Sequence, residues 1–153
     1  YFASNVCCAY RKDIFRKLEG FVNSTLFNED MIYAGTMAKQ GYGIAYAADA
    51  CVIHSHNYSC RQQFHRNFDL AVSQTMYPEV FGGIRSESEG IKLVKKSLSY
   101  CIKIGKPWLM IQVVTQSAGK LLGYKMGQQY RSLPMWLILR CTMSPSFWRG
   151  GKA

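Results

Sequence analysis

The stretch Phe27-Asn28-Glu29-Asp30-Met31-Ile32-Tyr33-Ala34 places two adjacent carboxylates between aromatic and aliphatic residues, and nowhere else in the chain do two acids stand side by side. Asn28 is favoured at the position before a helix, because its side-chain oxygen can accept from the free amides of the first turn. Glu29 and Asp30 then lie at the positive end of the helix dipole. We expect a helix from here to about Gln40, ended by Gly41. An acidic first turn with a purely structural role is the alternative.

The segments around this helix alternate between patterns typical of strands and of helices. Residues 11–18 predict an amphipathic helix, and a longer helix is expected from Ser59 until Pro78 ends it. Apolar, partly β-branched runs predict short strands at 5–9, 43–46 and 50–54. The order β-α-α-β-β is typical of the back half of an α/β domain, and Gly82-Gly83 is the clearest linker.

The rest of the chain is predicted to be helical and basic. Residues 91–153 hold eleven Lys and Arg and no acid, whereas residues 1–90 hold eight against nine. Helices are expected at about 86–103, 108–130 and 133–139. Gly119, Gly123 and Gly127, spaced four apart, predict a narrow face that another helix or a lipid surface can approach closely.

None of these apolar runs approaches the roughly 20 residues needed to span a bilayer. Basic helices with aromatic residues that are too short to span favour a position on an anionic membrane surface. Packing of the same faces as ordinary core is the alternative.

The composition fits one globular domain, with 153 residues of which 48% are apolar. The chain begins with Tyr1 rather than Met, and we expect it to be the downstream piece of a longer protein. Its six cysteines show no CxxC spacing and are expected to be reduced, which indicates the cytoplasm.

His54 and His56 follow an apolar run and are the first candidates for a site, although a hydrogen-bonded structural histidine is the commoner outcome. We expect only one of them to face a given site. With Cys60 and His65 they could also form a zinc site, but their spacing matches none of the common zinc motifs. Arg66 lies one turn after Gln62 and Gln63, and a guanidinium held that way suits a diphosphate. A solvated helix face is the alternative.

The order and spacing of several segments carry a resemblance. These segments are Asn5–Phe15, Gly20-Phe21, Phe27–Asp30, Gly41-Tyr42, Ile44–Tyr46 and Val52–Tyr58, with a looser match from Gly123 to Trp148. Together they resemble the second half of a family 2 glycosyltransferase, most closely the bacterial rhamnosyltransferases of surface-polysaccharide synthesis.

The resemblance implies a GT-A fold, which is of the α/β class, and inversion at the anomeric carbon. Residues 1–81 would form the acceptor-side half of the GT-A domain, a partial GT-A fold. Residues 84–153 would form a tail of basic amphipathic α-helices that associates with a membrane.

The resemblance also implies roles for particular residues. Asp30 would be the general base with Glu29 beside it, and a carboxylate there can take the proton of an attacking hydroxyl. A divalent ion, Mg or Mn, would be held by an Asp-x-Asp motif and by His54, with His56 as second choice and as a substrate contact. Gln63 and Arg66 match a Gln-x-x-Arg-Trp motif near the diphosphate and acceptor, except that Asn67 replaces the Trp.

The implied substrates are a nucleotide-diphospho-sugar donor, dTDP-rhamnose, and a lipid-linked glycan acceptor. The implied location is cytoplasmic, peripheral on the inner face of the cell membrane, with an anionic surface and no nucleic acid as partner. No Asp-x-Asp occurs in the chain, so we expect it to be inactive as a separate polypeptide. The alternative function is a non-enzymatic basic module that binds anionic membrane or nucleic acid.

Overall fold

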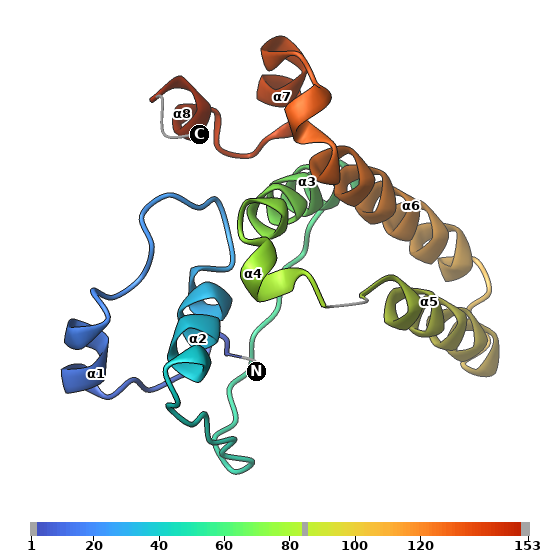
Figure 1. Ribbon diagram of the computed structural model, residues 1–153. Coiled ribbons are helices and arrows are strands. Elements are labelled where there is room, and N and C mark those ends of the chain that lie inside the picture. The colour runs from blue at the N-terminus through green and yellow to red at the C-terminus, as the bar shows by residue number, and fades with distance from the viewer. Residues whose placement is uncertain (1–2, 84–85, 151–153) are drawn as a thin grey trace.

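The computed structural model describes residues 3–83 and 86–150, with the backbone alone described at residues 86–89. Its regular elements are helices, shown in Figure 1: α1 Lys12–Lys17, α2 Glu29–Lys39, α3 Cys60–Met76, α4 Pro78–Phe81, α5 Ser86–Lys103, α6 Leu109–Gln128, the 3-10 turn η1 Tyr130–Ser132, α7 Met135–Cys141 and α8 Pro145–Arg149. The helices expected from the sequence are all present, within a few residues of their predicted bounds.

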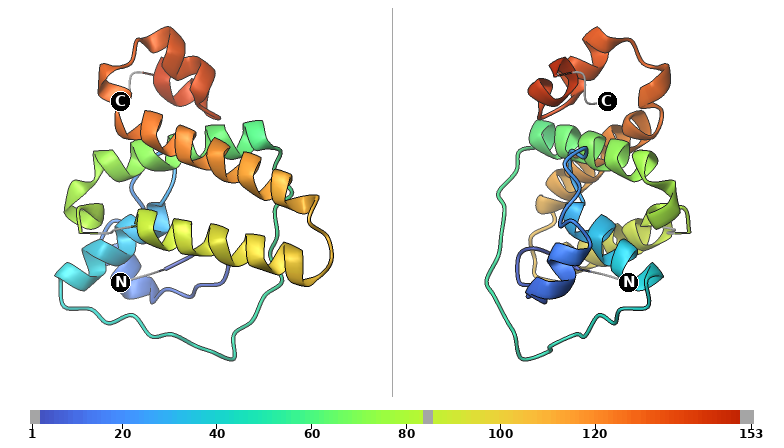
Figure 2. Two further views of the ribbon diagram at one scale, coloured as in Figure 1. Left: turned by 90° about the vertical axis from the view of Figure 1, so that its right-hand side faces the viewer. Right: turned by 60° about the vertical axis from the view of Figure 1, so that its left-hand side comes forward.

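The pair α3 and α6 forms the centre of the molecule, and α5 lies beside α6 (Figure 2). Gly119, Gly123 and Gly127 are buried on the face of α6 that meets α3. A Cβ atom at Gly119 would lie 2.9 Å from the Sγ of Cys60, and one at Gly123 would overlap the carbonyl oxygen of Phe64. The predicted glycine face is therefore confirmed, and another helix occupies it.

The main core lies where the C-terminal helices fold back on α3. Its buried side chains are Phe68, Val72, Ile138, Cys141 and Trp148. Because α6, α7 and α8 all follow Gly82-Gly83 and pack on α3, the basic half and the first half share this core. The predicted division into domains at residues 81–84 stays a prediction.

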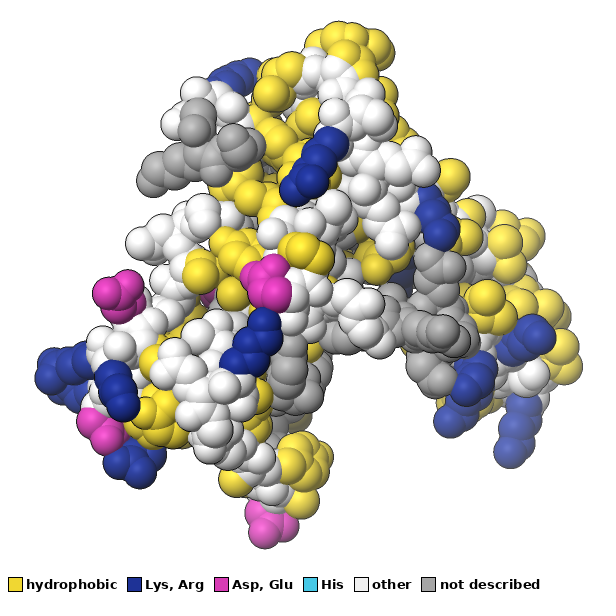
Figure 3. All heavy atoms as spheres, viewed as in Figure 1, with side chains coloured by type: hydrophobic (Ala, Val, Ile, Leu, Met, Phe, Trp, Pro, Cys, Tyr) yellow, Lys and Arg dark blue, Asp and Glu magenta, His cyan; other side chains and the backbone are white. Residues whose placement is uncertain are grey.

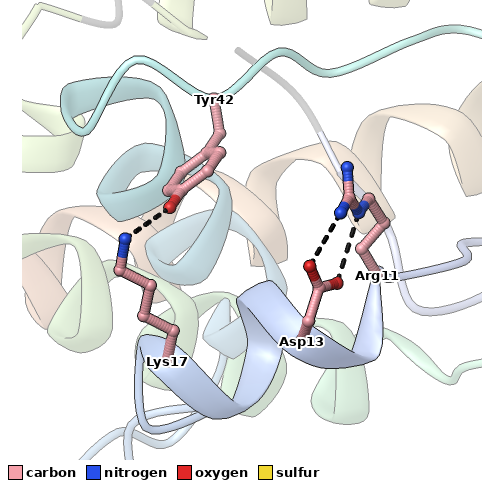
Figure 4. A network of polar contacts seen from close by, with 4 residues as sticks. All are labelled: Arg11, Asp13, Lys17 and Tyr42. Atoms are coloured by element: carbon pink, nitrogen blue, oxygen red, sulfur yellow. Dashed lines mark hydrogen bonds and ion pairs between the residues drawn. The ribbon is translucent and has the colours of Figure 1, made fainter.

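The N-terminal part is held together by aromatic and polar contacts. The rings of Tyr10, Phe15, Phe21 and Tyr33 pack within 5.0–5.9 Å of one another. At the two ends of α1, Arg11 pairs with Asp13 at 2.7 Å and Lys17 donates to the hydroxyl of Tyr42 at 3.1 Å (Figure 4). The second contact ties α1 to the segment that follows α2.

The predicted strands at 5–9, 43–46 and 50–54 are absent from the described residues, so the predicted α/β class is wrong for this part of the chain, whereas the predicted helices of the basic tail are present. Residues 43–57 instead form an exposed loop that runs away from the helices (Figure 2). A strand needs a neighbour that pairs with its amides and carbonyls, and no described segment pairs with this one. Tyr46 and Ile53 are consequently left open to solvent, at 93% and 105% exposure.

No helix in the described part of the chain combines the length and the apolarity that crossing a bilayer requires.

Candidate functional site

The acidic pair lies at the start of α2, as predicted, but Asn28 does not cap the helix with its side chain. Asn28 has a left-handed backbone with φ of 66°, and its carbonyl oxygen accepts from the amide of Ile32 at 2.9 Å. Asp30 Oδ1 accepts from the amide of Met31 at 2.8 Å instead. The predicted capping bond is therefore wrong, because Asn28 has a left-handed backbone rather than the extended one typical of a capping residue. Its Nδ2 atom is buried without a partner among the described residues.

Asn5 holds the two carboxylates from the opposite side. Its backbone amide donates to Asp30 Oδ2 at 2.9 Å, and its side-chain amide donates to Glu29 Oε1 at 3.1 Å. The Tyr10 hydroxyl donates to Asn5 Oδ1 at 2.9 Å, which fixes the orientation of the amide group. Burial, followed by the neighbouring Cys8, raises the pKa of Tyr10, so its hydroxyl keeps the proton that it donates.

The sequence prediction missed Asn5 and Tyr10. They belong to the segment that resembles rhamnosyltransferases, but nothing in their spacing shows that residues 5 and 30 meet.

The helix start is also fixed against α3. The buried Ser73 accepts the backbone amide of Phe27 at 2.9 Å. The Arg66 guanidinium, two turns earlier on α3, lies 5.2 Å from the centre of the Phe27 ring. These contacts bring the acidic pair close to Arg66, although 36 positions of sequence separate Asp30 from Arg66.

Five of the six predicted site residues line one cavity of about 440 Å³. They are Glu29, Asp30, His54, His56 and Arg66. This volume falls within the range of about 300–1,000 Å³ that is usual for small-molecule sites. The cavity combines a carboxylate pair, two imidazoles and one guanidinium.

Three aromatic rings lie in a row beside this cavity. His54 and His56, which line it, meet edge to face with ring centres 4.3 Å apart, and His56 stacks on Tyr58 at 4.9 Å. Arg66 lies over the other end of the row, 5.8 Å from the Tyr58 ring centre. Both histidines face the cavity, so the expectation that only one would do so is wrong. Residues two apart in an extended segment lie on the same side of it.

The sixth residue, Gln63, lies apart from Arg66 in a neighbouring cavity. Gln62 is used in the cap of α3, where its Oε1 accepts from the Ser59 amide at 2.8 Å and its own amide donates to Ser59 Oγ at 3.2 Å. Gln63 and Arg66 are one helical turn apart on α3 but line different cavities.

The possible zinc ligands do not come together. The Cys60 thiol donates to the Thr115 carbonyl at 3.2 Å, and His65 bonds to the Cys141 carbonyl at 2.8 Å. Within the described residues no three His, Cys, Asp or Glu side chains are placed to hold one ion.

The arrangement can perform acid–base chemistry on an uncharged hydroxyl next to an anionic group. Asp30 and Glu29 are acceptors in the cavity, while Arg66 supplies a fixed positive charge. A positioned carboxylate can remove the proton of a hydroxyl, and a guanidinium suits the oxygens of a phosphate.

Comparison with known proteins agrees with the sequence motifs. The chain is 39% identical over 150 residues to the O-antigen chain rhamnosyltransferase RfbN of Salmonella typhimurium, a match that covers 96% of the chain and 47% of that protein. It is 40% identical over 150 residues to the O-antigen chain rhamnosyltransferase WbaN of Salmonella anatum, with the same coverage of 96% and 47%. The chain thus spans about half the length of these curated relatives. No family model and no solved structure matches it.

Over nearly its whole length, therefore, the chain is similar to about half of each of two bacterial O-antigen chain rhamnosyltransferases, which confirms the resemblance to rhamnosyltransferases inferred from its motifs.

Proposed function

We propose that this protein transfers a rhamnosyl group from a nucleotide-diphospho-sugar, dTDP-rhamnose, to a lipid-linked glycan of the O-antigen type. The similarity to two O-antigen chain rhamnosyltransferases supports the class of reaction. The observation that carries the proposal for this chain is that Asp30, Glu29 and Arg66 line one cavity. The assignment to glycosyltransferase family 2, with inversion at the anomeric carbon, is part of the proposal and rests on the order of the motifs.

In the proposed reaction, a hydroxyl oxygen of the acceptor forms a bond to the anomeric carbon of the donor sugar. The bond between that carbon and the diphosphate oxygen breaks, and the electron pair leaves with the diphosphate. Asp30 takes the proton of the attacking hydroxyl. Asn5 holds Asp30 Oδ2 through its backbone amide and Glu29 through its side chain, so both carboxylates keep their orientation.

Arg66 is the proposed contact for the charged leaving group. Its guanidinium is held between Phe27 and Tyr58, 5.2 and 5.8 Å from their ring centres, which fixes the positive charge at the cavity wall. His54 is proposed as one ligand of a divalent ion, and His56 as a substrate contact. The ion, when bound, would stabilise the negative charge that develops on the departing diphosphate.

The test is Asp30→Asn in the complete protein, assayed for transfer of rhamnose to an O-antigen acceptor. Removal of a general base lowers kcat by about 10²- to 10⁴-fold. Asp49→Asn is the matched control, because Asp49 is an exposed acid in the loop that follows α2 and does not line the cavity. Transfer by Asp30→Asn at the rate of the control would disprove the assignment of the base.

We also propose that the protein lies on the cytoplasmic, inner face of the cell membrane through α5, α6 and α7. Large apolar side chains stay exposed on these helices, which also carry lysines or Arg140, although the glycine face of α6 is already covered by α3. These exposed side chains include Ile102, Ile111, Leu122 and Trp136, and Trp108 precedes α6. Figure 3 shows hydrophobic and basic side chains gathered side by side over α5. Such a surface suits an anionic lipid layer.

A further inference from the structure

A second cavity, of about 450 Å³, lies next to the one that holds the acidic pair. Residues from three elements line it: the loop before α3 with Asn57 and Tyr58, the start of α3 with Ser59 and Gln63, and α6 with Gln112 and Gln116. His56 lines both cavities and marks where they adjoin.

The lining of this second cavity is polar and carries no Lys, Arg, Asp or Glu among the described residues. Three glutamines and one asparagine each offer a donor and an acceptor, while Tyr58 and Ser59 add hydroxyls. Paired donors and acceptors without net charge match the hydroxyl groups of an uncharged sugar.

A phosphate fits this cavity poorly. The start of α3 could in principle attract an anion. Here, however, the amide of Gln62 already donates to Ser59 Oγ at 3.2 Å, and the amide of Ser59 donates to Gln62 Oε1 at 2.8 Å. Because these two amides are engaged and the lining holds no Lys or Arg, the cavity offers less to a phosphate than the first cavity does. The cation of the site, Arg66, faces the first cavity.

We infer that the second cavity binds an uncharged sugar unit of the acceptor glycan, with Gln112 and Gln116 of α6 as hydrogen-bonding contacts. This inference rests on the proposed function and names the part of the acceptor that this surface holds. An acceptor chain seated here passes His56 and places its terminal hydroxyl in the first cavity, near Asp30. Gln112 and Gln116 are one helical turn apart, so they lie on the same face of α6.

The experiment compares Gln112→Ala/Gln116→Ala with wild type in the complete protein. Direct binding is measured by calorimetry. The probe is an uncharged, lipid-free oligosaccharide released from the O-antigen of the bacterium that makes the protein. Each neutral hydrogen bond lost weakens binding by about fivefold, so the double variant should raise the Kd of the oligosaccharide on the order of 20-fold. The KM for the acceptor should rise in parallel, while the KM for dTDP-rhamnose changes less than about twofold, the effect of weak surface changes.

Gln128→Ala provides the matched control. Gln128 is an exposed glutamine on the same helix that does not line the cavity, so this variant should bind the oligosaccharide like wild type. An unchanged oligosaccharide Kd in the double variant would overturn the inference, as would a rise in the KM for the donor alone. Weaker binding of dTDP or inorganic phosphate by the double variant would also overturn it, because that result would make the cavity a phosphate site.

Failure of the proposed function gives a different result. A wild-type protein that transfers no rhamnose contradicts the proposed reaction, whereas the calorimetry still reports whether Gln112 and Gln116 hold an uncharged oligosaccharide.

Discussion

Asn5 is the residue whose contacts most directly touch the proposed chemistry, since it bonds to both members of the acidic pair. Its backbone amide donates to Asp30 and its side chain donates to Glu29. A substitution of the side chain therefore removes the bond to Glu29 and leaves the bond to Asp30 in place. Tyr10 acts through Asn5, because its hydroxyl fixes which end of the Asn5 amide group points toward Glu29.

We therefore predict that Asn5→Ala lowers kcat about tenfold, the usual effect of losing one hydrogen bond to a charged group. The loss should be absent in a Glu29→Ala background, because the side chain of Asn5 acts through Glu29. Asn23→Ala, at an exposed loop position, is the control. Equal losses from Asn5→Ala in both backgrounds would show that Asn5 stabilises the fold rather than the carboxylate. Steady-state kinetics of the four variants measures the difference.

Asp69 is a second residue with an unusual environment, buried on α3 under the C-terminal segment. Its carboxyl accepts from the Thr142 hydroxyl at 2.6 Å and from the Met143 amide at 2.7 Å. Burial raises the pKa of Asp69, and the two hydrogen bonds oppose that rise only in part. Asp69 therefore links α3 to the segment between α7 and α8, and its burial disfavours the charged form of its carboxyl.

This raised pKa predicts a pH dependence of stability. The folded protein binds the proton of Asp69 more tightly than the unfolded chain does. The contribution of Asp69 to the free energy of unfolding is therefore greatest below the ordinary pKa of about 3.9, and it is lost as the pH rises through the pKa of the folded state. Asp69→Asn has no such charge, so its unfolding free energy relative to wild type should increase across this pH range. Urea unfolding at a series of pH values measures it, and a difference that stays constant with pH would contradict the prediction.

At the scale of the elements, the contact between α3 and α6 decides the architecture. Gly123 allows the two backbones to meet, because any side chain there would overlap the carbonyl group of Phe64. The same contact forms the second cavity, because Gln112 and Gln116 of α6 line it together with Gln63 of α3 only when the two helices are this close.

Gly123→Ala should therefore destabilise the protein by about 2–3 kcal/mol, the cost of overfilling a packed contact. Gly90→Ala is the opposite-sign control, because Gly90 lies in α5 with open space where a Cβ would stand. That change should stabilise α5 by up to about 1 kcal/mol through helix propensity. Urea unfolding measures both, and equal effects of the two substitutions would show that α3 and α6 do not pack through Gly123.

At the scale of the whole molecule, charge and apolar surface are unevenly distributed. Residues 91–153, which include most of α5 and all of α6, carry positive charge and no acid, while the acidic pair lies in the first half of the chain.

This arrangement predicts that Lys95→Ser, Lys96→Ser and Lys103→Ser together weaken binding to anionic vesicles on the order of 100-fold, since each lysine near the surface contributes about 1 kcal/mol. The matched control removes three positive charges elsewhere, with Lys12→Ser, Arg16→Ser and Lys39→Ser. Vesicle sedimentation with a competing DNA duplex measures both. Equal binding by the two triple variants would contradict a specific lipid surface on α5, and displacement by the duplex would identify nucleic acid as the partner.

Much of the helical framework could be predicted because its signals are local. Ser59 and Pro78 bound α3 through a cap and a missing amide, and the glycine spacing on α6 marked a close approach before its partner was known. The prediction of strands was wrong because strand formation is not local. Residues 43–54 have a strand-like composition, but a strand depends on a neighbour elsewhere in the chain, and no described segment supplies it.

The sequence by itself determined the helices, the acidic pair at the start of α2 and the relationship to rhamnosyltransferases, because these depend on local patterns and on the order of motifs. Only the tertiary structure decided that Asn5 holds the pair, that Gln63 lies apart from Arg66, and that Asp69 fastens the C-terminal segment. Each of these depends on residues far apart in the chain, and their meeting is set by how α3 packs with α6 and with the start of α2.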